Sequence, residues 1–317
     1  MRGVSRILGF SFLLVAMAQA AWGWGQIGHR ASGYVAEAFL TPQSKQALQQ
    51  LLGKQRLADI STWADTLRGD ETLKHISPYH YESVREGTAY LDHLRRLSHD
   101  EIARGGVLQA ILVAERQMED PKVPMKQKEI ALRFLVHFIG DLHQPLHSGR
   151  PEDKGGNAIR VKWFGFDGSL HSIWDTGMIL SGHDDIFGRR ENNVDQSLVY
   201  ARKLLETHRG LMQPRATRDN PEAWLMESVQ SRVPAYNTDY KNNPMAYQER
   251  NLPTIDGRVY AAGLRIADVL NRIFANVAPP DSQTLLVKNI EALIGKIESI
   301  ITLGPRKPAG PSQEYWH

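Results

Sequence analysis

The strongest constraint on the fold of this chain is the spacing of its apolar residues. From Ile27 onward they recur at intervals of three and four along most of the sequence, as at Val107, Ala110, Ile111 and Ala114. Since an α-helix has 3.6 residues per turn, this spacing gathers them on one helix face. The pattern predicts a mainly α-helical fold, with further helices at about 128–143, 193–207, 221–235, 256–276 and 282–302.

One short segment departs from helical spacing. Ile159, Val161 and Trp163 alternate with polar residues, which is typical of a half-buried β-strand. The residues Phe164-Gly-Phe-Asp-Gly follow and are typical of a turn. We therefore expect one short β-hairpin beside the helices.

The composition is that of a folded globular protein without covalent cross-links. The chain has 317 residues, of which 42% are hydrophobic and 23% charged, and none is cysteine. A chain of this length buries roughly 75% of its unfolded surface, so a large core needs no disulfide. The lack of cysteine excludes thiol nucleophiles and zinc fingers. A bound transition metal must be held by His, Asp, Glu and terminal groups.

The first 23 residues predict export. Arg2 and Arg6 precede an apolar run from Ile7 to Ala18, which is too short to span a bilayer. This layout indicates a secretory signal peptide rather than a buried N-terminal helix. Cleavage could follow residue 20, 21 or 23. A cysteine-free exported chain fits a bacterial periplasm or culture medium better than a eukaryotic secretory route, so we expect a periplasmic or secreted bacterial protein.

Charge and the C-terminal composition complete the outline of the domain. Removal of Arg2 and Arg6 leaves 36 basic against 35 acidic residues, so the chain has no basic footprint for nucleic acid. Residues 305–317 are rich in proline, glycine and charge and are typical of a loose tail. We expect a single domain over residues 24–304.

The segment from Phe134 to His147 is the most informative one for chemistry. His137 and Asp141 are four residues apart, so on a helix their side chains leave the same face and can hold one metal ion. His137 lies in an apolar run, where an unpartnered polar group is costly. Pro145 ends the helix near Gln144 and turns His147 away from the helical register.

A second pair repeats this spacing, because His171 and Asp175 are also four residues apart. Either pair alone is more often ordinary helix decoration than a metal site. Two pairs with His147 between them favour a metal site.

Other candidates lie upstream in three short motifs. His29 follows Trp24 closely, Asp65 and Arg68 are three residues apart on an expected helix, and His80 lies between two tyrosines. Taken singly, each is better explained as a core residue, a surface ion pair or a satisfied loop residue.

Taken together, six motifs resemble one protein family. They are W-G-x-x-G-H from Trp24, W-A-D-x-x-R, Y-H-Y, F-L-x-H-F-x-G-D-x-H-Q-P-L-H, G-G-N and L-H-x-x-W-D ending at Asp175. In this order they closely resemble the trinuclear-zinc, single-strand-specific nucleases of fungi, plants and bacteria, to which mung bean nuclease belongs. The resemblance implies an all-α domain of the kind shared with zinc phospholipase C.

The resemblance also implies a ligand set for three Zn²⁺ ions. The first ion would be held by Asp65, His80, His137 and Asp141. The second would be held by His147, His171 and Asp175. The third would be held by His29, by the α-amine and carbonyl of Trp24, and by Asp141 as a bridge to the first. The neighbouring His143 is not a ligand in this family and is expected to have a structural role.

The third zinc site depends on where the signal peptide is cleaved. An amide nitrogen cannot coordinate zinc, whereas a free α-amine can. If Trp24 is a ligand, the signal peptide must be removed after Gly23.

The resemblance further implies hydrolysis of single-stranded DNA and RNA to 5′-phosphorylated products, with 3′-nucleotidase activity. A metal-activated hydroxide would attack phosphorus at the centre formed with Asp65 and Asp141, and Arg68 would stabilise the developing charge. Tyr81 would stack on a base, and Asn157 would contact it.

Base preference stays open because the sequence departs from fungal members in two places. Ser83 replaces an acidic residue that contacts the base, and Lys154 replaces an apolar one before the glycine pair.

Two other functions fit part of this pattern. A zinc phospholipase C shares the fold and the three metals, but G-G-N and Tyr81 count against it. A non-catalytic zinc store is disfavoured because the ligand count leaves open coordination positions. We expect a monomer with no obligate protein partner and no membrane association.

Overall fold

A computed structural model describes residues 24–188, 194–208, 210 and 221–275 of the chain. The expected signal peptide (1–23), the expected helix at 282–302 and the expected tail at 305–317 lie outside these residues. Those three expectations therefore stay predictions.

The described residues form a mainly helical fold, as the apolar spacing predicts. The longer helices are α1 (Gln26–Phe39), α2 (Pro42–Leu52), α7 (Val107–Glu119), α8 (Met125–His143), α12 (Gln196–Thr207), α13 (Pro221–Ser231) and α14 (Pro244–Phe274). The short helices are α3 (Leu57–Ile60), α4 (Trp63–Thr66), α5 (Tyr90–Arg96), α6 (His99–Arg104), α9 (Leu170–Ser172), α10 (Met178–Gly182) and α11 (Asp184–Phe187).

Segments of 3₁₀ or π helix connect several of these helices. The 3₁₀ segments are η1 (Leu67–Gly69), η2 (Glu71–His80), η3 (Pro145–Ser148), η4 (Pro151–Asp153), η7 (Val233–Tyr236) and η8 (Thr238–Lys241). The π segment is η5 (Ile173–Gly177).

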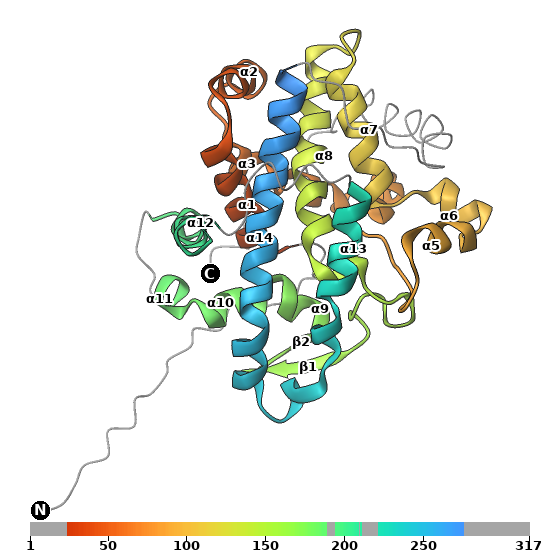
Figure 1. Cartoon of the computed structure of the whole chain (residues 1–317), viewed down its shortest axis with the longest axis vertical. Coiled ribbons are helices and arrows are strands. Elements are labelled where there is room, and N and C mark those ends of the chain that lie inside the picture. The colour runs from red at the N-terminus through yellow and green to blue at the C-terminus, as the bar shows by residue number, and fades with distance from the viewer. Residues whose placement is uncertain (1–23, 189–193, 209, 211–220, 276–317) are drawn as a thin grey trace, which may run out of the picture.

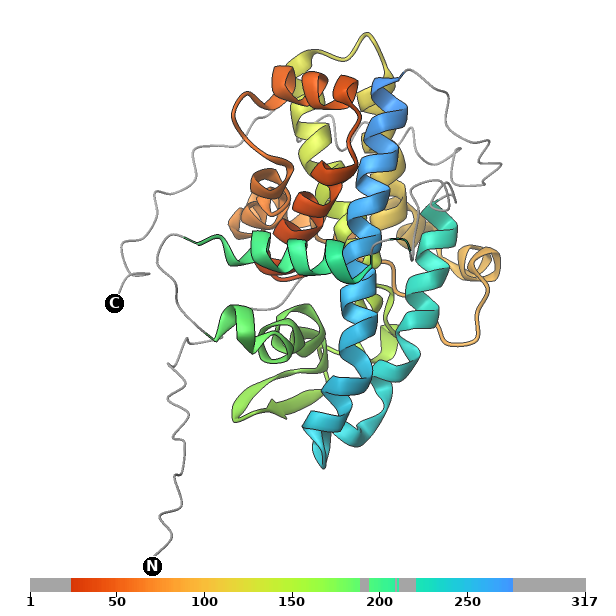
Figure 2. The same cartoon turned by 60° about the vertical axis from the view of Figure 1, so that its left-hand side comes forward.

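Helix α14 runs the length of the molecule and organises the bundle (Figure 1). It packs against α1 and α8, and α7 packs on α8. The view turned by 60° shows α12 crossing α14 and the β-hairpin near the start of α14 (Figure 2). Among the described helices, none is both long and apolar enough to cross a bilayer.

The end of α8 follows the sequence prediction. The helix stops at His143, and Gln144 takes an extended conformation before Pro145. His147 then lies on η3, off the register of α8. The residue before a proline avoids the helical region, which explains why the chain turns here.

The hairpin is confirmed, but its turn is shorter than expected. Strands β1 (Arg160–Trp163) and β2 (Phe166–Ser169) are antiparallel, and Trp163 is paired with Phe166. Only Phe164 and Gly165 form the loop, both with positive φ, as two-residue hairpin turns that match strand twist require. The expectation that residues 166–168 belong to the turn was therefore wrong.

Helix α14 is also longer than expected. It begins at Pro244 rather than near residue 256 and continues through Pro253. Proline disfavours a helix interior because it lacks an N–H donor. Here Tyr247, Asn251 and Ile255 bury one face of α14 on both sides of Pro253, and this packing outweighs the local preference.

Two apolar cores meet within the bundle. The first contains residues of α2, α7 and α8, and the second contains Trp24, Leu146, Trp163 and Trp174. Helices α1 and α14 contribute to both cores. The helices and turns that carry the expected metal ligands therefore belong to both cores, and the ligands lie at the junction between the two.

Close packing of α1 on α14 generates a prediction. A Cβ atom on Gly263 would lie 2.5 Å from Val35 Cγ1 and 2.8 Å from the Ser32 carbonyl oxygen. We expect Gly263→Ala to destabilise the fold by about 1–3 kcal/mol, because the two helix backbones must separate. Chemical denaturation measures this loss. Gly257→Ala, on the same helix with space at its Cβ position, should be neutral or stabilising; equal stability of both variants would contradict the packing argument.

Candidate metal centre

Asp65, His80, His137 and Asp141 converge on one point, although they come from three separate elements. His80 Nδ1 lies 2.8 Å from Asp141 Oδ2 and 3.0 Å from His137 Nε2. Asp65 Oδ1 lies 3.9 Å from His80 Nδ1 and 3.6 Å from His137 Nε2. Asp65 is on α4, His80 ends η2, and the other two are on α8, so the bundle brings together what the sequence separates.

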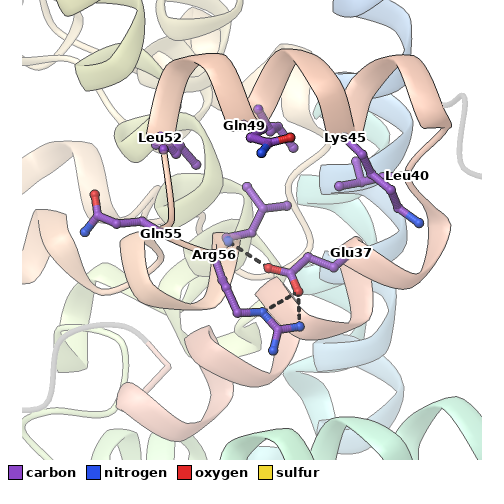
Figure 3. Close-up of a pocket in the computed structure, with 10 residues that line it drawn as sticks. Glu37, Leu40, Lys45, Gln49, Leu52, Gln55 and Arg56 are labelled. Atoms are coloured by element: carbon purple, nitrogen blue, oxygen red, sulfur yellow. Dashed lines mark hydrogen bonds and ion pairs between the residues drawn. The ribbon is translucent and has the colours of Figure 1, made fainter.

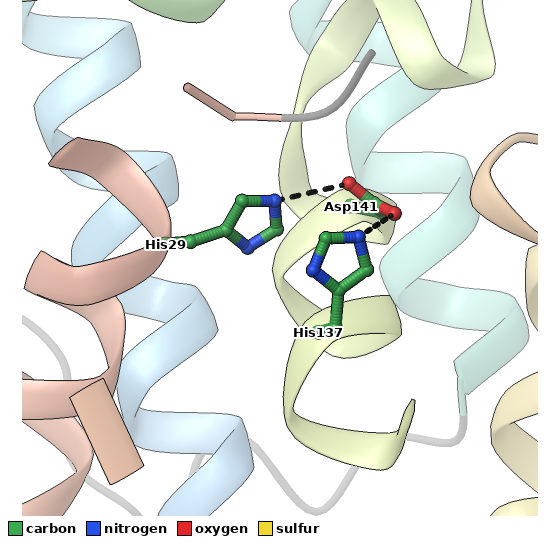
Figure 4. A group of neighbouring side chains, drawn as sticks. All are labelled: His29, His137 and Asp141. Atoms are coloured by element: carbon green, nitrogen blue, oxygen red, sulfur yellow. Dashed lines mark ion pairs between the residues drawn. The ribbon is translucent and has the colours of Figure 1, made fainter. Parts of the chain in front are cut away.

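His29 of α1 joins this group from the opposite side (Figure 4). Its Nε2 lies 3.3 Å from Asp141 Oδ1, while the other carboxylate oxygen of Asp141 faces His137. The rings of His29 and His137 stack with centroids 4.2 Å apart. Asp141 thus presents one oxygen to each of two neighbouring groups, which is the arrangement expected of a bridging carboxylate.

His147, His171 and Asp175 form the third group, and their ligand atoms lie within 4.8 Å of one another. The rings of His147 and His171 stack at 5.0 Å. Gln144, which the sequence reasoning assigned no role, donates its side-chain amide to Asp175 Oδ1. Two sequence signals could have marked it: it is a specified position of the motif around His137, and it directly precedes Pro145.

Backbone carbonyls fix the orientation of three histidines. The Nδ1–H groups of His137, His147 and His171 donate to the carbonyl oxygens of Ser61, His80 and Gly155, at 2.7, 2.6 and 2.6 Å. With its proton on Nδ1, each ring carries an acceptor lone pair on Nε2. Metal-binding histidines are commonly oriented by such a bond from the other ring nitrogen.

A π turn places the second His–Asp pair. His171 is on α9 and Asp175 is on η5, where Met178 N–H bonds to Ile173 O five residues earlier. The sequence spacing suggested an ordinary helix here. Single π turns are rare and are often found at functional sites.

Several buried polar atoms at this junction have no hydrogen-bond partner within the described residues. They include both ring nitrogens of His29, Nε2 of His80, Oδ1 of Asp141 and Oδ2 of Asp175. Leaving such atoms unpaired in a protein interior is costly. Neutral imidazoles and carboxylates facing one another are the donors that zinc takes, so these residues fit a metal ion.

Burial shifts the pKa values of several of these groups. Burial lowers the pKa of His80 and of His171 to about 4, which keeps both rings neutral at neutral pH. Burial also raises the pKa of Asp175 well above its usual range. For His137, burial opposes protonation, but the neighbouring Asp141 and Asp65 outweigh it and raise the pKa.

Trp24 is fully buried at the edge of the same centre. Gly25 N–H donates to Asp175 O at 3.2 Å, which ties the chain beside Trp24 to η5. A side chain on Gly28 would collide with Trp24, since its Cβ would lie 2.9 Å from Trp24 Cβ. The chain at Trp24 therefore packs against α1, which carries His29, and is tied through Gly25 to η5, which carries Asp175.

Arg68 lies on η1 and pairs with Asp65, with 3.0 Å between Arg68 Nη2 and Asp65 Oδ1. Its side chain is mostly buried, and burial lowers its pKa. The carboxylates of Asp65, Asp141 and Asp175 act in the opposite direction. A positive side chain therefore lies close to these three carboxylates.

The residues expected to bind substrate lie on two loops beside the centre. Tyr81 directly follows the cluster residue His80 and is half-buried. Lys154 is exposed, and its carbonyl accepts a bond from Asn157 Nδ2 at 3.0 Å. The amide of Asn157 thus closes the loop. Gly155 between them has φ +63°, and a Cβ there would lie 2.4 Å from Leu146 O.

His143 points away from the metal centre. Its Nδ1–H donates to Ile139 O, and its Nε2 accepts from Arg265 at 2.6 Å. Arg258 bonds to the His143 carbonyl and to Glu227, which also pairs with Arg265. These contacts give His143 the structural position expected of it, at the end of α8.

A pocket of about 380 Å³ lies elsewhere on the surface, between α1, α2 and α3 (Figure 3). Glu37 crosses it to bond with Arg56 Nε and the Leu57 N–H, both at 2.9 Å. It shares no residue with the three His–Asp groups.

Comparison with known proteins finds similarity to nucleases of one family. A sequence model described as S1/P1 Nuclease matches residues 24–275. Nuclease S1 of Aspergillus oryzae is 34% identical over 180 residues, which cover 55% of this chain and 60% of that protein. Endonuclease 2 of Arabidopsis thaliana is 30% identical over 271 residues, covering 80% and 91%. Nuclease P1 of Penicillium citrinum is 34% identical over 169 residues, covering 50% and 61%.

The chain belongs to the S1/P1 nuclease family. This confirms the resemblance carried by the six motifs and the class of enzyme that it implied, a hydrolase of phosphoric ester bonds. The match ends at residue 275, directly after α14. It therefore includes the helices beyond residue 180 as well as the six motifs.

Space at Gly140 generates a prediction about the centre. A Cβ atom there would lie 2.7 Å from Nδ1 of His29. Alanine is the better helix former, so Gly140→Ala should not unfold α8. It should displace the His29 ring and lower the metal content by about one ion per chain, measured by elemental analysis after dialysis. Gly257→Ala is the matched control, and unchanged metal content in Gly140→Ala would contradict the packing of His29 against α8.

Proposed function

We propose that this protein hydrolyses phosphodiester bonds in single-stranded DNA and RNA with three Zn²⁺ ions, leaves 5′-phosphorylated products, and removes phosphate from 3′-mononucleotides. The observation that carries the proposal is the convergence of three adjoining His–Asp groups whose lone pairs face one another. Three such groups match the number of ions implied by the motifs. Family membership supports a nuclease over a phospholipase.

The proposed division of ligands follows the geometry. Asp65, His80, His137 and Asp141 Oδ2 would hold one ion, and His147, His171 and Asp175 a second. His29, Asp141 Oδ1 and the backbone of Trp24 would hold the third. Bound zinc supplies Lewis acidity that activates water and neutralises phosphate charge.

The chain's own residues add binding and orientation. Arg68, fixed by Asp65, presents a guanidinium to non-bridging phosphate oxygens, where positive charge favours the crowded transition state. Gln144 holds Asp175 through one carboxylate oxygen and leaves the other for the ion. No described side chain is required as a general base.

Selectivity for single strands is proposed to come from Tyr81. Its ring follows a ligand residue directly, so a base stacked on it would place the adjoining phosphate near the centre. A base in a duplex is already stacked and cannot bind there without unpairing. Stacking tolerates every base, so it gives strand selectivity without sequence readout.

Export is part of the proposal because Trp24 acts through a new α-amine. We propose that the signal peptide is removed after Gly23 and that the mature enzyme is periplasmic or secreted. Mass spectrometry of the secreted protein tests this. A mature chain that begins at residue 21 or 22 would remove the α-amine of Trp24 from the ligand set.

The activity is tested with purified mature protein on single-stranded DNA, RNA and a phosphatidylcholine emulsion, each with and without chelator. We expect chelator-sensitive release of acid-soluble 5′-nucleotides from both nucleic acids. Diacylglycerol release would instead support a phospholipase C. Zinc binding without either product would support a metal store.

Asp141 offers the sharpest test of the bridging arrangement. We expect Asp141→Ala to lose about two zinc ions and nearly all activity, because one carboxylate serves two sites. Elemental analysis and an oligonucleotide assay measure both effects. Full zinc content in this variant would contradict the bridge.

Tyr81 tests the stacking platform. We expect Tyr81→Ala to raise KM for a single-stranded oligonucleotide about tenfold and to leave kcat little changed, since stacking contributes about 1–3 kcal/mol per base. Tyr81→Phe, which keeps the ring, is the matched control. If KM in Tyr81→Ala equals that of wild type, the ring does not bind a base.

A further inference from the structure

Arg232 is a buried cation without a carboxylate partner within the described part of the chain. It lies between α13 and η7, and only 2% of its surface is exposed. Burial lowers the pKa of its guanidinium. An unpaired buried charge is costly, so a side chain of this kind needs compensating contacts.

Those contacts are two backbone carbonyls. Arg232 Nη1 donates to Val84 O at 2.6 Å and also to Ser148 O. Among the described residues, no backbone N–H reaches either of these oxygens. The guanidinium therefore satisfies two acceptors that would otherwise be buried and unpaired.

The two carbonyls belong to the segments that carry a proposed substrate contact and a proposed ligand. Val84 is three residues after Tyr81, and Ser148 directly follows His147. The segments pair directly, because Glu82 N–H donates to His147 O at 2.9 Å and Val84 N–H donates to Gly149 O at 3.1 Å. Arg232 adds to this pairing because it bonds to one carbonyl of each segment.

Tyr236, one turn further along, reaches the next loop. Its hydroxyl accepts from the Arg150 N–H at 3.2 Å and contacts Asp153 Oδ1 at 3.3 Å. Asp153 Oδ1 also accepts the Gly156 N–H at 2.7 Å, within the loop that ends at Asn157. Residues 232–236 thus contact both proposed substrate loops, the one that follows Tyr81 and the one that ends at Asn157.

We propose that Arg232 is a positioning residue for substrate binding, and this rests on the proposed nuclease function. By holding the Val84 and Ser148 carbonyls, its guanidinium sets the separation between the Tyr81 ring and the metal centre at His147. Arg232 touches neither the ligand atoms nor the stacking ring. Its loss should therefore misplace the base-binding loop while the metal ions remain bound.

The test compares substrates with and without bases. Arg232→Met removes both donors at similar side-chain length, and Arg232→Lys keeps the charge but loses the planar fork. Steady-state kinetics are measured on oligothymidylate and on an oligonucleotide of the same length built from abasic residues. Zinc content and thermal stability are measured in parallel.

We expect Arg232→Met to raise KM for oligothymidylate about tenfold, comparable to the loss of one stacked base, with kcat and zinc content near those of wild type. Activity on the abasic substrate should change less than twofold. Arg232→Lys should show a smaller rise in KM.

Arg250→Met is the matched control, because Arg250 forms an exposed ion pair with Asp239. Equal losses on both substrates, or loss of zinc, would overturn the proposal and leave Arg232 a purely structural residue. If Arg232→Met does not fold, wild-type KM in Arg232→Lys overturns it. Wild-type protein that cleaves neither nucleic acid would instead refute the proposed function.

Discussion

The structure depends on one electrostatic requirement at the junction of its two cores. Five imidazoles and three carboxylates, most of them fully buried, aim their lone pairs at a shared volume. Hydrogen bonds cannot satisfy such a set, because it has too few donors. A bound cation would satisfy these acceptors, and its charge would oppose the burial that raises the pKa of Asp175. Since these ligands come from both cores, metal binding should be coupled to folding of the whole bundle.

Much of the fold could be predicted from the sequence because its signals are local. The stop at Pro145 and the alternation at Ile159, Val161 and Trp163 depend on neighbouring residues alone. The start of α14 could not be found in this way. Passage of the helix through Pro253 depends on burial against distant elements, and tertiary packing can override a local preference.

The candidate centre was predictable to a similar extent. The eight side chains that the motifs nominate as ligands lie in the three His–Asp groups of the structure, while their role as ligands stays a prediction. The supporting residues were not predictable. Gln144, Gly140 and Arg232 act through contacts with segments far away in the chain, and nothing in their immediate sequence indicates those contacts. The π turn that carries Asp175 is likewise invisible in a His–Asp spacing of four.

The carbonyl acceptors of His137, His147 and His171 have a consequence for how such an enzyme can change over time. Each ring is steered by a peptide group, so its orientation is encoded by the path of the main chain rather than by the identity of any side chain. Replacing Ser61 leaves its carbonyl in place, whereas His80 is itself a proposed ligand and a side chain on Gly155 would collide with Leu146 O. At Ser61 the side chain can therefore vary during evolution as long as the main chain keeps its course and continues to orient His137.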